Sequence, residues 1–193
     1  MTNMKNEGFE IRVIRKSIQK RTVGVVARTR TVGTYAVYID GVQQPGLRGT
    51  MAEQKGPSDN SSDGAKYDRR IAPGRYPLWT QNGTKYKTFG YLDTPAAQKQ
   101  FKYKPRPGIE LKETGKRAEI LIHPASGFLS SEGCMHPSNA LADGNADIDH
   151  AAESRPRVLA LIKAMKDYCG NSFPKTNGKR LPNCWCVVED DFS

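Results

Sequence analysis

The sequence has few of the residues that build disulfide scaffolds or metal centres. It contains four cysteines and three histidines among 193 residues. Four cysteines are too few for a disulfide-dense fold, and their spacing relative to the histidines matches no compact zinc-ligand set. We therefore expect no metal and no other cofactor. Cys184 and Cys186 flank Trp185, and either could pair with Cys169, a choice that spacing alone leaves open.

Long apolar segments are also missing. No hydrophobic run approaches the ~18 residues of a membrane-spanning helix, so we expect no membrane insertion. The segment from Met1 to Glu7 lacks the apolar middle region of a secretory signal. We expect the protein to be made in the cytoplasm, and to need a non-classical export route if it acts elsewhere.

The charge balance is basic, with 30 Lys and Arg residues against 20 Asp and Glu residues and a formal net charge of +10. A basic chain favours anionic partners such as nucleic acid, anionic lipid or an acidic polymer, without choosing between them. Zinc-finger spacing and the aromatic–basic signature of an RNA-binding sheet are both missing. We expect no specific nucleic-acid partner and a largely solvated basic surface.

Short β-prone runs separated by turn signals predict a mainly β fold, built as one domain over residues 1–193. Residues 1–33 are interpreted as N-terminal strands or an arm, and residues 43–67 as loop-like, with 56–66 a flexible loop. A substrate lid at 56–66 is the lesser alternative to a tolerated insertion. Strands are expected at 9–14, 22–27, 34–39, 75–79, 84–92, 109–112, 120–122 and 184–188, with a tight turn at Asp40-Gly41.

One helix is expected in the C-terminal half, over residues 154–169. Ser154 is suited to capping it, and the apolar residues between 158 and 165 fall on one side at helical spacing. This helix should cover one face of a sandwich or barrel-like sheet. The Lys- and Pro-rich stretch 99–108 is interpreted as a linker or a basic rim. His150 lies in an acidic stretch and is expected to be solvated.

The most informative stretch is 119–137. The apolar run Ile120-Leu121-Ile122 predicts a short buried strand that ends at His123, and Pro124 keeps His123 on extended backbone. After a short loop comes Ser131-Glu132-Gly133-Cys134. A histidine at a strand end and a cysteine framed by Ser and Gly are what a thiol nucleophile with a nearby base requires.

The residues of this stretch suit distinct catalytic roles. His123 could take the proton of Cys134, giving a thiolate–imidazolium pair. The amides of Gly133 and Cys134 could form an oxyanion hole. Ser131 could orient the turn or add a hydrogen bond, and the carbonyl of Pro124 is a candidate for fixing the imidazole tautomer.

Other interpretations of the same residues remain open. His136 lies two positions after Cys134 and shares its face on extended backbone, so it is a rival base. His123, His136 and Cys134, together with the Cys184/Cys186 pair, could also bind zinc, although their spacing argues against it. A buried cysteine and a structural histidine are the commonest roles of these residue types.

The motif resembles the catalytic motif of the L,D-transpeptidase domain, a family of cysteine enzymes of peptidoglycan. Both have a histidine, a loop and then Ser-x-Gly-Cys, here His123 and 131–134. The segment 71–76 (Ile-Ala-Pro-Gly-Arg-Tyr) resembles the Thr-Pro-x-Gly-x-Phe strand entry of that family. The runs 122–125 and 133–135, followed by a helix, are more similar still to a small uncharacterised family found in phages and beside bacterial secretion systems.

The resemblance implies an L,D-transpeptidase-like β-sandwich or barrel. It also implies that Cys134 is the nucleophile and His123 the base, with Gly133 in the oxyanion hole. The chain has Glu132 where the transpeptidases usually have a second histidine, and His136 where they have Arg or Asn. Glu132 and His136 are therefore candidate substrate contacts, and the differences bear on the choice of acceptor.

The function implied by the resemblance is modification of peptidoglycan stem peptides. Cys134 would attack the carbonyl of diaminopimelate, expel D-alanine and form a thioester, which water or an amine would resolve. The implied reactions are those of an L,D-carboxypeptidase or an L,D-transpeptidase, including D-amino-acid exchange. Without a signal peptide, a secreted antibacterial effector with a cognate immunity protein, or a phage wall enzyme, is expected. The alternative is a non-catalytic basic binding or structural module of a phage or secretion system, in which Cys134 is inert.

Overall fold

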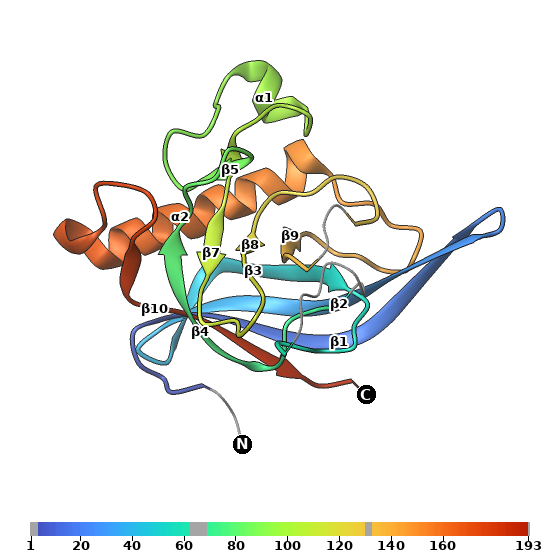
Figure 1. The fold of residues 1–193 in the computed structure, drawn as a ribbon, viewed down its shortest axis with the longest axis horizontal. Helices are drawn as coiled ribbons and strands as arrows, with labels where there is room; N and C mark the ends of the chain where they lie inside the picture. Colours follow the sequence, from blue (N-terminus) through green and yellow to red (C-terminus); the bar gives the residue numbers. More distant parts are fainter. Residues whose placement is uncertain (1–3, 62–68, 130–132, 193) are drawn as a thin grey trace.

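A computed structural model describes residues 4–61, 69–129 and 133–192. The fold is mainly β, with 44% strand and 16% helix, and has one helix in its C-terminal part that covers a nearly closed, barrel-like sheet (Figure 1). The elements in chain order are β1 (Phe9–Val23), β2 (Val26–Ile39), β3 (Val42–Gln54), β4 (Gly74–Thr80), β5 (Tyr86–Lys87), α1 (Pro95–Lys99), β6 (Arg106–Pro107), β7 (Ile109–Leu111), β8 (Ile120–Ile122), β9 (His136–Ser138), a π-helical turn (His150–Ser154), α2 (Arg155–Cys169), a 3₁₀ turn (Gly170–Ser172) and β10 (Arg180–Asp190).

Eight strands form one sheet in the order β8-β7-β4-β10-β1-β2-β3-β9. Neighbouring strands are antiparallel, except that β1 and β10 run parallel, with Phe9 opposite Cys184. The first and last strands of the chain are therefore neighbours in the middle of the sheet. The sheet curls until its edges meet, and Ile122 of β8 forms a parallel bridge with Met135, directly before β9.

Strands β1 and β2 form a long hairpin that projects from the rest of the sheet (Figure 1). The expected strand at 22–27 is wrong, because Val23 pairs with Val26 and these residues form the end of the hairpin. The chain turns there at Gly24, whose φ of 60° suits a residue without a Cβ. The turn at Asp40-Gly41 is confirmed, and both residues have positive φ, as a type I′ turn requires.

Two further sequence-based expectations change. The first part of the loop-like region 43–67 is instead strand, because β3 continues to Gln54 and pairs with β2 along most of its length. Of the expected flexible loop 56–66, residues 62–66 lie outside the described residues. The expected strand 84–92 is reduced to β5, which pairs with β6 in a separate two-stranded sheet. The backbone then turns at Gly90, where φ is 71°.

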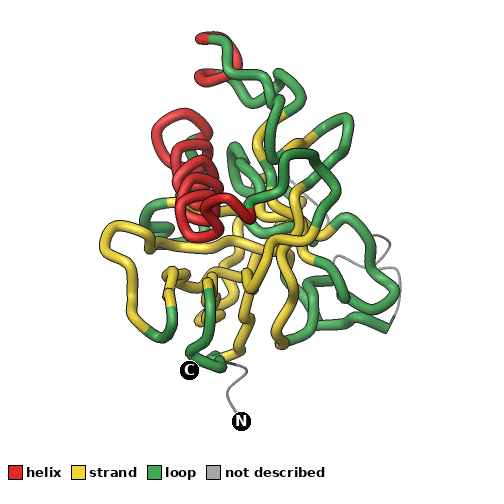
Figure 2. Tube along the Cα trace, turned by 90° about the vertical axis from the view of Figure 1, so that its left-hand side faces the viewer, coloured by secondary structure: helices red, strands yellow, loops and turns green. Residues whose placement is uncertain are grey.

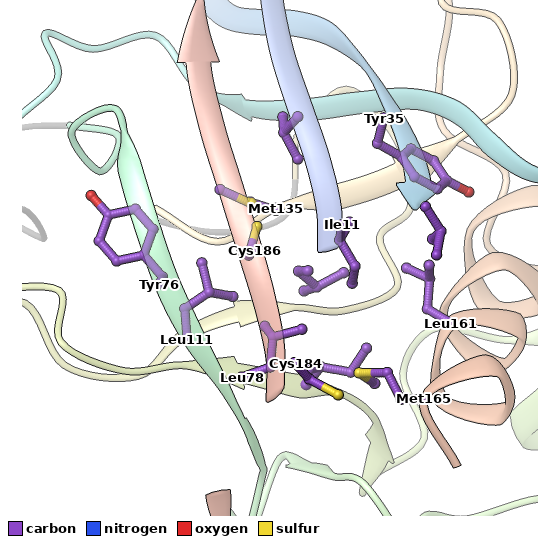
Figure 3. Packing of buried hydrophobic residues seen from close by; sticks show 14 of the residues in the cluster. Ile11, Tyr35, Tyr76, Leu78, Leu111, Met135, Leu161, Met165, Cys184 and Cys186 are labelled. Atoms are coloured by element: carbon purple, nitrogen blue, oxygen red, sulfur yellow. The ribbon is translucent and has the colours of Figure 1, made fainter. Parts of the chain in front are cut away.

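Helix α2 packs across the sheet, as the periodicity of 154–169 predicted. Figure 2 shows the helix lying against one side of the strands. Figure 3 shows Leu161 and Met165 pointing from the helix toward the strands that carry Ile11 and Cys184. Each such buried aliphatic side chain stabilises the fold by about 1.5–3 kcal/mol. The buried side chains of α2 are Arg155, Val158, Leu161, Ile162 and Met165.

The start of the helical segment differs from expectation. The helical turns begin at His150, and the side chain of Asp149 accepts hydrogen bonds from the amides of Ala151 and Ala152. The cap role expected of Ser154 is wrong, because its hydroxyl accepts from Ala125 N at 3.0 Å and so ties the loop after β8 to the helix. His150 is buried rather than solvated, since its place in the first turn directs the ring into the structure.

Among the described residues, no helix is long and apolar enough to cross a membrane.

The four cysteines are all free thiols. Cys184 and Cys186 are both buried on the core side of β10, as their alternation predicted. The Sγ of Cys169, at the end of α2, lies 3.6 Å from the Sγ of Cys184. Cys184 is therefore the partner within reach of Cys169.

We predict that oxidation links Cys169 to Cys184. Formation of the bond requires the sulfurs to approach to ~2.05 Å, and burial raises the pKa of both thiols, so an alkaline oxidised-glutathione buffer is appropriate. The 15-residue separation corresponds to about 3 kcal/mol of added stability in the chain-entropy account. Peptide mapping and urea denaturation with and without reductant measure both effects. The variant Cys169→Ser should show neither, and a disulfide involving Cys134 would contradict the prediction.

Candidate active site

The two edges of the sheet meet along a short stretch of backbone. The amide of Met135 donates to Leu121 O at 2.8 Å, and the amide of His123 donates to Met135 O at 3.1 Å. The side chains of Ile122 and Met135 are fully buried in the main core. Closure of the sheet therefore fixes the register between β8, which leads to His123, and the segment that contains Cys134.

This register brings the expected site residues to one face. Because alternate residues of an extended chain face opposite sides, His123 and Leu121 lie on the face away from Ile122. By the same rule, Cys134 and His136 lie on the face away from Met135. His123 and His136 are lateral neighbours, with ring centroids 4.6 Å apart at 72°. Cys134 lies beside Leu121, diagonal to His123.

The His123 ring is held in one tautomer. Its side chain is buried, and Nδ1 lies 2.7 Å from the carbonyl oxygen of Pro124. Because a carbonyl oxygen only accepts, Nδ1 carries the proton and Nε2 presents a lone pair. The expected role of the Pro124 carbonyl is therefore confirmed.

The imidazole of His123 is neutral at physiological pH. Burial lowers its pKa well below the usual value, and His136 and Arg106 lower it further, while the Pro124 carbonyl opposes them. A neutral imidazole with a free Nε2 can accept a proton but does not hold one at rest. The expected thiolate–imidazolium pair is thus disfavoured in the resting protein, and a proton transfer would accompany the attack of the thiol.

His136 is buried, as His123 is. It pairs with Ala52 of β3 in the sheet, and its Nδ1 lies 3.3 Å from His123 O. Burial lowers its pKa to about 4. His136 is therefore a neutral neighbour of His123, and both candidate bases are almost wholly buried.

Cys134 is only partly buried, so the sulfur can be reached from solvent. The amide of Leu121 donates to Sγ at 3.4 Å, and the thiol donates to Glu119 O at 3.5 Å. These two contacts hold the sulfur against the backbone at the start of β8. Glu119 has a φ of 55°, an uncommon conformation for a residue with a Cβ, directly before β8.

Gly133 has a conformation that only glycine adopts easily. Its φ is 134°, and a Cβ there would lie 2.1 Å from Nη2 of Arg117. The glycine expected before the cysteine is therefore required by backbone geometry. Ser131 and Glu132 lie outside the described residues, so their expected roles stay predictions.

Two residues of the site were not found from the sequence. The ring of Tyr86 in β5 lies 4.1 Å from the His123 ring, centroid to centroid. Nη1 of Arg106 in β6 donates to the Tyr86 hydroxyl at 3.2 Å. Burial raises the pKa of the Tyr86 hydroxyl; Arg106 lowers this pKa, and Cys134 raises it. The hydroxyl therefore interacts electrostatically with both Arg106 and Cys134. No local motif marks either residue, because the β5–β6 pairing brings them to the site.

The described residues contain no group of three or more His, Cys, Asp or Glu side chains arranged to hold a metal ion. The arrangement can instead support nucleophilic attack by a thiol with a neutral imidazole as base.

Comparison of the chain with known protein families, with curated proteins and with solved structures gave no match.

We predict that His136 makes the fold sensitive to acid. Its pKa is about 4 in the folded protein against an ordinary 6.5, so between these values the unfolded chain binds a proton that the folded chain does not. The free energy of unfolding should therefore fall as the pH falls from about 6.5 to 4, by a total of about 3 kcal/mol from this residue. Urea denaturation across this range, for the wild type and His136→Asn, measures the difference. Equal pH slopes in the two proteins would contradict the prediction.

Proposed function

We propose that the protein is a cysteine enzyme of the L,D-transpeptidase type that modifies peptidoglycan stem peptides through a thioester on Cys134. One observation carries the proposal. A partly exposed thiol and a neutral imidazole of fixed tautomer share one face, at the point where the sheet closes. The mainly β fold with one covering helix supports the finer assignment to an L,D-transpeptidase-like sandwich or barrel.

The proposed reaction uses His123 as base and then as acid. Nε2 takes the thiol proton as Sγ of Cys134 attacks the carbonyl of diaminopimelate. The amides of Gly133 and Cys134 stabilise the oxyanion, an interaction whose loss typically costs about 10²–10³ in rate. The carbon–nitrogen bond then breaks, and His123 returns the proton to the amine of the departing D-alanine.

The thioester is resolved by the reverse use of the same groups. If water attacks, His123 takes its proton, the thiol is regenerated, and the product is a shortened stem peptide with a free carboxylate. If an amine attacks, the product is a cross-link or an exchanged D-amino acid. Glu132 and His136 are the candidate contacts for this acceptor.

The biological setting is part of the proposal and depends on the resemblance of residues 119–137. The setting would be that of a secreted antibacterial effector or of a wall enzyme encoded by a phage. An effector would require a cognate immunity protein in the producing cell.

The proposal is tested by incubating the protein with purified muropeptides and analysing the products by mass spectrometry. We expect the wild type to remove one alanine from tetrapeptides or to exchange it for an added D-amino acid. Cys134→Ala should abolish this change, and His123→Gln should slow it by about 10²–10⁴, the usual contribution of a general base.

Cys169→Ser is the matched control, because Cys169 is also partly exposed but contacts Cys184 at the end of α2. It should keep full activity. The absence of any Cys134-dependent change on muropeptides would end the enzyme proposal.

A second candidate function is binding without catalysis, and one feature favours it. The face of β1–β3 that points away from α2 carries a cavity of about 540 Å³ lined in part by Arg12, Tyr38 and Arg48. The Arg12 guanidinium lies 3.8 Å above the Tyr38 ring. Arg12 is paired with Glu10, so Arg48 supplies the charge with which this groove could bind an acidic polymer.

For this alternative we expect co-sedimentation with anionic cell-wall polymer that persists in Cys134→Ala. It should weaken in Arg48→Gln and at raised salt, because the attraction is electrostatic. Arg28→Gln, on the exposed hairpin, changes the net charge equally and should have little effect. Equal weakening by both arginine variants would indicate non-specific charge attraction and contradict the binding function.

A further inference from the structure

Buried arginines without a carboxylate partner among the described residues include Arg30 and Arg70, which contact neutral side chains and backbone carbonyls. Arg106 is distinguished by its position, because it contacts Tyr86, the residue that packs on His123.

Only 6% of the surface of Arg106 is exposed. Arg15 forms ion pairs with Glu53 and Asp190, and Arg155 forms one with Asp93. In the part of the chain that the structure describes, Arg106 has no carboxylate within ion-pair distance.

The contacts of Arg106 hold it in place without neutralising it. Nε donates to Phe101 O and Nη1 to the Tyr86 hydroxyl, and Nη2 makes no hydrogen bond to the described residues. The guanidinium lies 3.7 Å above the Phe101 ring, and the amide of Arg106 donates to Lys85 O at 2.9 Å. Burial lowers the pKa of Arg106, as expected for a positive charge short of counter-charge.

Tyr86 links Arg106 to the residues of the candidate site. Its hydroxyl accepts a hydrogen bond from Arg106, its ring packs on the His123 ring, and its pKa is affected by the charge of Cys134. A guanidinium with a free Nη2 is suited to a carboxylate, which it can bind through two parallel hydrogen bonds. A held cation beside a nucleophile and its base is a recognition site for an anionic part of the substrate.

We propose that Arg106 is a specificity-determining residue of this site, and that it binds a carboxylate of the acyl donor next to the carbonyl that Cys134 attacks. The inference rests on the proposed function and narrows its substrate to peptides with a free carboxylate beside the bond that breaks. A stem peptide ending in diaminopimelate and D-alanine supplies such a group.

The bound carboxylate would also act on the base. In the free protein Arg106 lowers the pKa of His123. A negative charge placed on Arg106 offsets that effect, because an opposite charge nearby favours the protonated imidazole. The base would therefore become stronger when a carboxylated substrate is in place.

The first test measures charge preference at the thiol and needs no peptidoglycan. Cys134 is alkylated with iodoacetate, an anion, or with iodoacetamide, its neutral counterpart, and the rates are read by peptide mass spectrometry. Cys169 in the same sample is the internal reference. We expect the iodoacetate-to-iodoacetamide ratio at Cys134 to exceed that at Cys169, and to fall about tenfold in Arg106→Gln, the size of a lost charge-assisted hydrogen bond.

Two further variants separate the hydrogen-bonding geometry of Arg106 from its charge, and its local effect from a change in net charge. Arg106→Lys keeps the charge but loses the paired donors, so it should retain part of the preference. Arg28→Gln removes the same charge from the exposed hairpin and should leave the ratio unchanged. If Arg106→Gln unfolds, Arg106→Lys takes its place, and a ratio in this variant equal to that of the wild type would contradict the role of the paired donors. A wild-type ratio at Cys134 equal to that at Cys169 would overturn the proposal by itself.

The second test uses turnover of matched stem peptides with a free or an amidated carboxylate. The wild type should prefer the free form by about tenfold or more in kcat/KM, and Arg106→Gln should lose this preference. Turnover without any carboxylate preference overturns the role of Arg106 and leaves the proposed function standing. A clear alkylation preference without turnover overturns the proposed function and supports the anion site.

Discussion

The arrangement of the site depends on the closure of the sheet. The edges of a sheet carry unpaired backbone groups, and here those of β8 and the segment before β9 satisfy each other through Leu121, His123 and Met135. The burial of Ile122 and Met135 makes this register the stable one. A slip by one residue would move Cys134 into the core and Met135 onto the outer face. The same contact that completes the fold therefore orients the thiol.

How much the sequence predicts follows from how local each signal is. The strand ending at His123, the turn at Asp40-Gly41 and the span of α2 depend on adjacent residues or on periodicity, and all three are confirmed. The Asp149 cap replaces the expected Ser154 because tertiary contact takes the Ser154 hydroxyl. Tyr86 and Arg106 could not be predicted at the site, since a pairing between two short strands brings them there.

Burial decides what kind of base this site can hold. The burial of His123 and His136 disfavours a positive charge on either ring. The pKa of each is lowered because the charged form loses its hydration. Both rings are therefore neutral near pH 7, and each can accept a proton only at that cost.

The positive net charge is only partly a property of the surface. Several arginines are buried, and Arg15, with Glu53 and Asp190, joins three strands of the sheet. Arg30 is satisfied by Gln19 and by the backbone carbonyls of Phe128, Asp143 and Ala146. A charge total cannot separate these structural arginines from one that recognises a ligand. The difference lies in position. Arg30 and Arg70 also lack a carboxylate partner in the described chain, but they contact neutral groups away from the thiol. Arg106 contacts Tyr86 beside His123, so it points to an anionic ligand more strongly than the net charge of +10 does.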